Sequence, residues 1–479
     1  MLEVLIAFQP EIGSASFPTL ASLCRFMSLE SLNDIPGYQD SNINPTWQYH
    51  NFLGFTSHRN PYAKDPANNL KVDLIYQYGA PANISEYTIR AQLVQFTQFR
   101  TLFESFRFKM FEWYTAVLFW KSQSPWPSLR GGLYDWFLGM TGGYYGVRSA
   151  LSGTSSAGIG DTNIQSWVHA QMNLMDHSIA VVTSPTTTTT PDDTGSMMVP
   201  LCIQVHAYTL AGCQSGRLLY SKTFHIPAKQ QQQEPNAAVI SIPNSSLPFV
   251  GDNVTLYRII TTTTIENEEE NPMSISEYWL SNWTSSSSSS PSANGSINNI
   301  PVQDLSSLGE WREDTSNHVA LDVSAMYCGY CREDDDGIKI SQSSSSSICN
   351  AAGCSHSEIA VSLTNPTALA TTNYYHTDDY RNYCGKEAIA FAVWTELHSS
   401  ETDDATTTKD TRVLPTLYSN GLFSILRNET RYVCMDPSLG QNGNSEISKL
   451  QVHISGWNVK DVIVPVQETQ VKDTTIEVD

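Results

Sequence analysis

A single glutamate near the start of the chain is the residue best placed to do chemistry. Glu11 follows five apolar residues, Val4–Phe8, which predict a short buried strand. Pro10 ends that strand, because proline has no backbone N–H for the ladder. The chain then turns into a helical segment over 19–27. Glu11 is therefore predicted at the carboxyl end of a parallel-type strand, where the catalytic side chains of a βα barrel collect. From position alone, a glutamate in a hydrated loop is the alternative.

A tryptophan follows a second predicted strand in the same way. Residues 115–120 are rich in strand-forming types, and Trp120 ends the run. A long helix that begins near Ser85 precedes this strand, with apolar side chains at three- and four-residue steps. After it, the prolines around Trp126 force a loop, and residues 133–140 are predicted to form a further short helix.

The order strand, helix, long loop, helix, strand, loop, helix is that of the last units of a βα barrel. Two strands cannot close a barrel, and a buried strand at residue 4 needs neighbours that nothing upstream in this sequence supplies. We therefore expect residues 1–155 to be part of a barrel, and the chain to be the carboxyl-terminal part of a longer protein.

From about residue 165 the period of the apolar residues changes to two. Short alternating strands separated by turn signals are typical of an antiparallel sandwich. The first set runs from Val168 to Trp279 and the second from Val319 to Ile454. The predicted fold class is thus α/β plus all-β: the last part of a (β/α)8 barrel, then two immunoglobulin-like β-sandwiches. We place these sandwiches at 156–283 and 300–466, followed by a flexible tail at 467–479.

Charge and hydropathy exclude several classes of partner. The net charge of −21 argues against nucleic acid. No run of 18 apolar residues occurs, so we expect no membrane span. The 11 Trp and 22 Tyr suit stacking on sugar rings, although ordinary cores also use them. Neither a glycine-rich phosphate loop nor a Gly-x-Ser-x-Gly elbow is present.

Nine cysteines leave metal and disulfide interpretations open. The spacing of Cys328, Cys331, Cys349 and Cys354, with His356 nearby, resembles a zinc site whose second pair is too wide. In a secreted sandwich, disulfides or free thiols are the favoured interpretation, so we expect no metal and no cofactor. The secretory pathway, with a vacuolar, lysosomal or extracellular destination, is also indicated by six glycosylation sequons. These sequons begin at Asn83, Asn244, Asn253, Asn282, Asn294 and Asn428.

A carboxylate and an aromatic ring at neighbouring strand ends fit glycoside hydrolysis, although that reaction needs a second carboxyl group. The chain resembles glycoside hydrolase family 2, in the branch of the mannosylglycoprotein endo-β-mannosidases and exo-β-glucosaminidases. The most specific block is FWKSQSPWPSLRG, at 119–131. Further segments that carry the resemblance lie at 8–14, 47–50, 91–95, 133–135, 143–146, 169–171, 411–415 and 455–458.

The resemblance implies a retaining β-glycosidase that acts on β-mannosidic or β-glucosaminidic bonds of oligosaccharides or glycoproteins. Glu11 falls on the nucleophile, and Trp120 falls on the aromatic floor of the sugar subsite. Trp126 and Gln123, on the loop that follows, are expected to line that subsite. Trp47 and His50 are equally placed to touch sugar or to support a loop. The general acid/base is expected upstream of residue 1, which leaves the chain catalytically incomplete.

A second function stays open. A non-catalytic carbohydrate-binding or cell-surface sandwich protein would also suit the Ser/Thr-rich tracts between the predicted strands, such as Ser285–Ser290.

Overall fold

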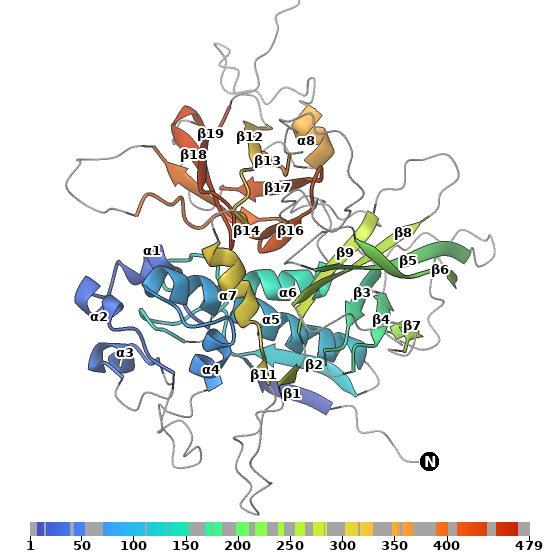
Figure 1. Ribbon diagram of the computed structural model, residues 1–479, viewed down its shortest axis with the longest axis horizontal. Helices are drawn as coiled ribbons and strands as arrows, with labels where there is room; N and C mark the ends of the chain where they lie inside the picture. The colour runs from blue at the N-terminus through green and yellow to red at the C-terminus, as the bar shows by residue number, and fades with distance from the viewer. Residues whose placement is uncertain are drawn as a thin grey trace, which may run out of the picture. The chain divides into compact units, whose positions relative to one another are not determined.

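The protein divides into two compact units, which we describe separately. In the computed structural model, unit 1 comprises 1–155, 163–318 and 370–388, and unit 2 comprises the remaining residues. Figure 1 shows the helices and strands of both. The residues that the structure describes are 7–13, 16–38, 43–52, 70–110, 113–130, 132–152, 168–174, 176–183, 198–209, 216–227, 238–243, 254–263, 272–281, 283–284, 302–314, 317–328, 347–352, 354, 358–366, 389–400, 410–437 and 447–467.

Unit 1 begins with two parallel strands. Strand β1 (Ala7–Ile12) pairs in parallel with β2 (Tyr114–Phe119). The sequence predicts that β1 ends before Pro10, and this is wrong. The ladder becomes irregular between Gln9 and Ile12, so Pro10 lies where no regular backbone donor is needed. The described residues show these two strands and not a closed barrel, so the barrel stays a prediction.

Short helices and one long helix connect β1 and β2 (Figure 1). The helix predicted at 19–27 is shorter than expected, and its α-helical part ends at Leu23. The long helix is confirmed, but its N-cap is Asn83, whose side chain accepts the Glu86 N–H at 3.1 Å. The helices of this part are α1 (Leu20–Leu23), α2 (Leu29–Asn33), α3 (Pro45–Tyr49), α4 (Leu70–Tyr76), α5 (Ile84–Phe108) and α6 (Gly142–Ser152).

The helix predicted at 133–140 is wrong. That segment is a loop held by Asp135, whose carboxylate accepts the N–H groups of Phe137 and Gly139, both at 2.9 Å. Because these side-chain bonds satisfy local donors, they compete with a helix. The helix α6, which the sequence did not predict, begins immediately after the loop. Its first N–H, on Gly142, donates to Gln92 Oε1 of α5 at 2.7 Å.

The first β-sandwich is confirmed in unit 1. Its core is formed by apolar residues from both sheets, including Val181, Val205 and Ile259. One sheet has the order β3-β4-β7 and the other the order β6-β5-β8-β9. The strands are β3 (Val168–Met172), β4 (Ile179–Thr183), β5 (Met198–Thr209), β6 (Arg217–Pro227), β7 (Ala238–Ile242), β8 (Thr255–Thr263) and β9 (Pro272–Leu280).

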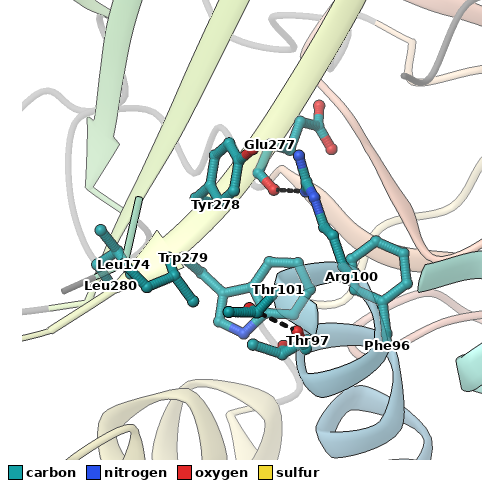
Figure 2. Close-up of a pocket in the computed structure, with 9 residues that line it drawn as sticks. All are labelled: Phe96, Thr97, Arg100, Thr101, Leu174, Glu277, Tyr278, Trp279 and Leu280. Atoms are coloured by element: carbon teal, nitrogen blue, oxygen red, sulfur yellow. Dashed lines mark hydrogen bonds between the residues drawn. The ribbon is translucent and has the colours of Figure 1, made fainter. Parts of the chain in front are cut away.

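Helix α5 packs on this sandwich through polar side chains. Strand β3 is buried on both faces, because His169 and Gln171 point to α5 rather than to water. Figure 2 shows Arg100 of α5 beside Tyr278 of β9, with its guanidinium donating to the Glu277 carbonyl. A cavity of about 20 Å³ remains beside Arg100 and Tyr278. The polar residues of α5 therefore fix the helix against the sandwich.

After the first sandwich the chain returns to the helices of unit 1. Strands β10 (Trp283–Thr284) and β11 (Val302–Gln303) pair, and α7 (Ser306–Glu313) follows. The Leu305 N–H donates to the Gln77 carbonyl at 2.9 Å. Residues 302–313 therefore belong to unit 1, although the sequence places them in the second sandwich. The reason is a long-range contact, because Gln77, the residue that follows α4, lies more than 200 positions before Leu305 and accepts its N–H.

Unit 2 contains the second β-sandwich, which is also confirmed. Its sheets have the orders β12-β13-β17-β15 and β16-β14-β18-β19. Val361 and Val433 of the first sheet, and Val393 and Val452 of the second, are fully buried. The elements are β12 (Asp322–Tyr327), α8 (Ser347–Ala352), β13 (Ile359–Thr364), β14 (Ala390–Ser399), β15 (Leu417–Tyr418), β16 (Phe423–Ile425), β17 (Thr430–Asp436), the 3₁₀ helix Ile447–Lys449, β18 (Leu450–Ser455) and β19 (Val462–Pro465).

Two disulfides join α8 and its surroundings to the sandwich of unit 2. They are Cys328–Cys349 and Cys354–Cys434. The Sγ atoms of Cys354 and Cys434 and a Glu358 carboxylate oxygen lie within 4.8 Å of one another. Because the two sulfurs are already bonded to each other, they are not thiolate ligands, and the disulfide interpretation is favoured over zinc. Cys331, His356 and the tail at 467–479 lie outside the described residues, apart from Gln467.

None of the helices in the described part of the chain is long and apolar enough to cross a membrane.

Candidate functional site

The carboxyl ends of β1 and β2 lie side by side. Ile12 pairs with Phe119, and the Trp120 N–H donates to the Ile12 carbonyl at 2.7 Å. A side chain on Gly13 would collide with the Trp120 carbonyl oxygen, so a glycine is required for this close approach. Glu11 precedes Ile12 in β1; its backbone is described and its side chain is not. The structure thus places the backbones of Glu11 and Trp120 at one rim, as the sequence predicts.

Trp120 presents a large aromatic surface at this rim. Its side chain is 60% exposed although it directly follows a strand. The Trp120–Lys121 peptide bond is cis. The Lys121 ammonium lies 5.9 Å from the centre of the indole ring. An exposed flat ring of this kind can stack on the C–H face of a sugar.

Trp126 and His50 come together in an aromatic cluster with Tyr49. The rings of His50 and Trp126 are stacked with centroids 5.9 Å apart, and Tyr49 meets both rings edge-on. His50 Nδ1 bonds the Pro127 carbonyl at 2.9 Å, and the Leu129 N–H donates to the His50 carbonyl at 2.8 Å. His50 is buried, whereas Tyr49 is 73% exposed. His50 therefore holds the loop and Tyr49 offers the accessible ring, which the sequence did not single out.

Trp47 lies in the core. Its indole stacks on Phe17 with centroids 5.9 Å apart, and its Nε1–H donates to the Ser31 carbonyl at 2.7 Å. The side chain has no exposed surface. Of the two roles that the sequence left open, this environment favours support of the loop over contact with sugar.

Gln123 stabilises the loop between Trp120 and α6. Its side-chain amide donates to the carbonyls of Asp135 and Trp136 at 3.3 and 3.2 Å. Ser122 accepts the N–H groups of Leu133 and Tyr134 at its carbonyl, at 2.8 and 2.9 Å. These bonds fold the segment after Trp120 back onto 132–136. They give Gln123 a positioning role, and its contact with sugar stays a prediction.

Three basic side chains, Lys121 and Arg130 of this loop and Lys71 of α4, interact around it, and the sequence did not identify them as a group. Lys71 Nζ donates to the Leu129 carbonyl at 2.6 Å, next to Arg130. Burial and the Arg130 charge lower the pKa of Lys71 to about 7. The same two causes, burial first, lower the pKa of Lys121. Lys121 could have been identified from the sequence, because it directly follows Trp120. Lys71 could not, because nothing in the sequence relates it to this loop.

A separate polar cluster joins α5 to β3 and β9. Glu104 accepts the Tyr278 hydroxyl at 2.8 Å and lies 3.3 Å from His169 Nε2. Burial lowers the pKa of His169 to about 4, although Glu104 acts in the opposite direction. Burial raises the pKa of Glu104, but Arg100 and His169 together outweigh the effect of burial, and the net shift is downward. His169 is therefore neutral and Glu104 ionised at neutral pH, a pattern that stabilises the interface.

A cavity of about 420 Å³ lies along α5, away from the predicted sugar-binding side chains. Gly13 lines it at the end of β1, together with Tyr78, Thr97 and Trp279. None of Trp120, Trp126, Gln123, Trp47 or His50 lines this cavity.

Comparison with known proteins gives three matches that bear on this site. The chain is 33% identical over 183 residues to a mannosylglycoprotein endo-beta-mannosidase of Lilium longiflorum, which covers 36% of this chain and 16% of that protein. It is 27% identical over 150 residues to an exo-beta-D-glucosaminidase of Hypocrea jecorina, covering 31% of this chain and 16% of the relative. The predicted resemblance is confirmed. No family model matches the chain.

The fold is shared with a solved structure over nearly the whole chain. The crystal structure of the Amycolatopsis orientalis exo-chitosanase CsxA superposes with a TM-score of 0.60 at 21% identity. The match covers 96% of this chain and 42% of that one. The chain therefore spans only a part of the length of the proteins it resembles, and the activity of a whole protein is a matter for proposal.

Proposed function

We propose that this chain forms part of a retaining β-glycosidase that hydrolyses β-mannosidic or β-glucosaminidic bonds in oligosaccharides or glycoproteins. The observation that carries the proposal is the pairing of two strand ends, one bearing Glu11 and the other Trp120. The names of the matched relatives, a β-mannosidase and a glucosaminidase, support the substrate class. A βα barrel around the β1–β2 pair is part of the proposal.

In the proposed mechanism, Glu11 attacks the anomeric carbon and forms a glycosyl–enzyme intermediate, which water then hydrolyses. Trp120 stacks on the sugar ring and holds it against the carboxylate. Trp126 and Tyr49 offer further aromatic surface on the adjoining loop. The reaction also needs a carboxyl group that protonates the leaving oxygen. We assign no residue of 1–479 to that role and propose that it lies elsewhere in a longer protein.

The proposed compartment is the secretory pathway, with a vacuolar, lysosomal or extracellular destination. The two disulfides of unit 2 support it, because such bonds persist in oxidising compartments.

The role of Glu11 can be tested without the missing acid. A 2,4-dinitrophenyl 2-deoxy-2-fluoro-β-mannoside has a leaving group that needs no proton, so a nucleophile alone can displace it. We expect a glycosyl adduct on the peptide that contains Glu11, found by mass spectrometry, and none in Glu11→Gln. Glu30→Gln, which alters an exposed carboxylate on α2, should label like the parent chain.

An adduct at another residue, or none, would contradict the nucleophile assignment. If the chain then still bound oligosaccharide, the non-catalytic glycan-binding alternative would be favoured. A steady turnover of nitrophenyl β-mannoside that Glu11→Gln abolishes would instead show that the acid/base lies within this chain.

A further inference from the structure

The loop that follows Trp120 is positively charged, in a chain whose net charge is −21. The Lys121 ammonium lies 5.9 Å from the centre of the Trp120 ring, the ring proposed to bind sugar. Arg130 is exposed at the end of the same loop. Neither Lys121 nor Arg130 forms an ion pair with a carboxylate in the part of the chain that the structure describes.

Hydrogen bonds fix the backbone of Arg130 within this loop. The Ser124 hydroxyl donates to the Arg130 carbonyl at 2.8 Å, and the Arg130 N–H donates to Ser128 Oγ at 3.3 Å. Lys71, which bonds the neighbouring Leu129 carbonyl, adds a third basic group from α4. Burial lowers the pKa of both Lys71 and Lys121, and the Arg130 charge lowers it further in each case.

We propose that this cation cluster, Lys71, Lys121 and Arg130, selects a neutral β-mannoside and rejects a protonated β-glucosaminide at the Trp120 subsite. The inference rests on the proposed function and decides between its two sugars. A glucosaminide carries an amine at carbon 2, where a mannoside carries a hydroxyl group. A protonated amine beside the partly exposed Lys121 and the exposed Arg130 is repelled, whereas a hydroxyl group is not.

The nucleophile offsets this selection only in part. An ionised carboxylate at Glu11 would attract a protonated amine at carbon 2, and it would oppose the two cations with one negative charge. The two positive charges of Lys121 and Arg130 exceed this single negative charge. We expect the repulsion between like charges a few ångströms apart near a protein surface to weaken binding about tenfold or more, which corresponds to about 1.4 kcal/mol or more.

The test is a binding titration of the full chain with three disaccharides by calorimetry. β-1,4-Mannobiose is neutral, the β-1,4-glucosamine disaccharide is cationic at a pH of about 6, and its N-acetylated form is neutral with the same ring. We expect the glucosamine disaccharide to bind roughly tenfold or more weakly than mannobiose, with the gap narrowing as salt is raised. N-acetylation should recover affinity if charge rather than shape causes the rejection.

Charge reversal supplies the decisive comparison. Lys121→Glu and Arg130→Glu should each raise the affinity for the glucosamine disaccharide several-fold relative to the affinity for mannobiose. Lys222→Glu, an exposed site on β6, makes the same charge change outside the cluster and should alter neither.

Equal or tighter binding of the glucosamine disaccharide, unchanged by salt or by the cluster variants, would overturn the inference and leave the glycosidase proposal intact. Failure of all three sugars to bind would contradict the proposed function, and this inference with it.

Discussion

Trp120 is the side chain whose environment separates a binding role from a structural one most clearly. Buried tryptophans of this protein, such as Trp47, have polar and aromatic partners on all sides. Trp120 is 60% exposed, and the aromatic or cation–π contact that its ring makes within the described residues is with Lys121. Its removal should therefore cost the fold little.

We expect Trp120→Ala to weaken oligosaccharide binding about tenfold or more, because the lost ring removes roughly 1.5–3 kcal/mol of apolar burial against sugar. The melting temperature should stay within a degree or two. Trp47→Phe is the matched comparison: it should lower the melting temperature through a cavity and a lost hydrogen bond to Ser31. Unchanged binding by Trp120→Ala, measured by calorimetry, would remove Trp120 from the subsite.

At the scale of elements, the contact between α5 and the first sandwich depends on His169 being neutral. His169 has no exposed surface and lies 3.3 Å from Glu104. Arg100 and Arg107 of α5 also face it, and both disfavour a charge on its ring. Protonation would place a cation among guanidinium groups, with Glu104 as the opposing charge.

The sign of the pH dependence follows from the lowered pKa of His169. Its value is about 4 in the folded state against 6.5 as the reference, so the unfolded chain binds more protons between these values. Stability of unit 1 should be unaffected by this group above pH 6.5 and should fall as pH drops toward 4, by about 1.4 kcal/mol per unit at most. Protonation of Glu104 at still lower pH should lower the stability of unit 1 further.

Urea unfolding at a series of pH values should show that slope in the parent chain. In His169→Gln it should be reduced, and in His225→Gln, which changes an exposed histidine on β6, it should be retained. An equal slope in the parent chain and in His169→Gln would contradict the assignment.

Local signals in the sequence predicted most of these elements, and long-range contacts account for those they missed. Alternation of apolar residues located β3, β13 and β18, because each buries one face in a sandwich core. It did not show that the other face of β3 is buried too, since His169 and Gln171 find their partner on α5, 65 and 67 positions away. The sequence predicts a helix at 133–140, where the structure has a loop, because composition does not reveal that Asp135 bonds to the backbone.

The candidate site also contains some residues that the sequence predicts and others that depend on long-range contacts. The strand ends bearing Glu11 and Trp120 could be predicted, since each follows its own apolar run. The places of Tyr49 and of the cation cluster in the site could not be predicted from the sequence, because they depend on contacts between loops that are distant in the chain. Lys71 approaches Arg130 only after α4 has packed beside the loop, as its bond to the Leu129 carbonyl shows.

At the scale of the whole molecule, the two sandwiches differ in how they are stabilised. The core of the first is apolar residues from two sheets, and its described cysteine, Cys202, is unpaired. The second carries the disulfides Cys328–Cys349 and Cys354–Cys434, with sequence separations of 21 and 80 residues. A cross-link that closes a longer loop removes more entropy from the unfolded chain.

Replacing both members of a disulfide by serine should therefore destabilise unit 2 and not unit 1. Loop entropy predicts an upper limit for the loss of folding stability of about 4.5 kcal/mol for the 80-residue separation of Cys354–Cys434. The corresponding limit is about 3 kcal/mol for the 21 residues of Cys328–Cys349.

Hydrogen exchange read by mass spectrometry can follow each unit in the same sample. Protection in β13 and β17 should fall in both double variants, more in the Cys354/Cys434 pair, because β17 carries Cys434. Protection in β5 and β8 should be unchanged, since those strands belong to unit 1. A matched loss in β5 and β8 would mean that the two units unfold together, and the disulfides would then stabilise the entire chain.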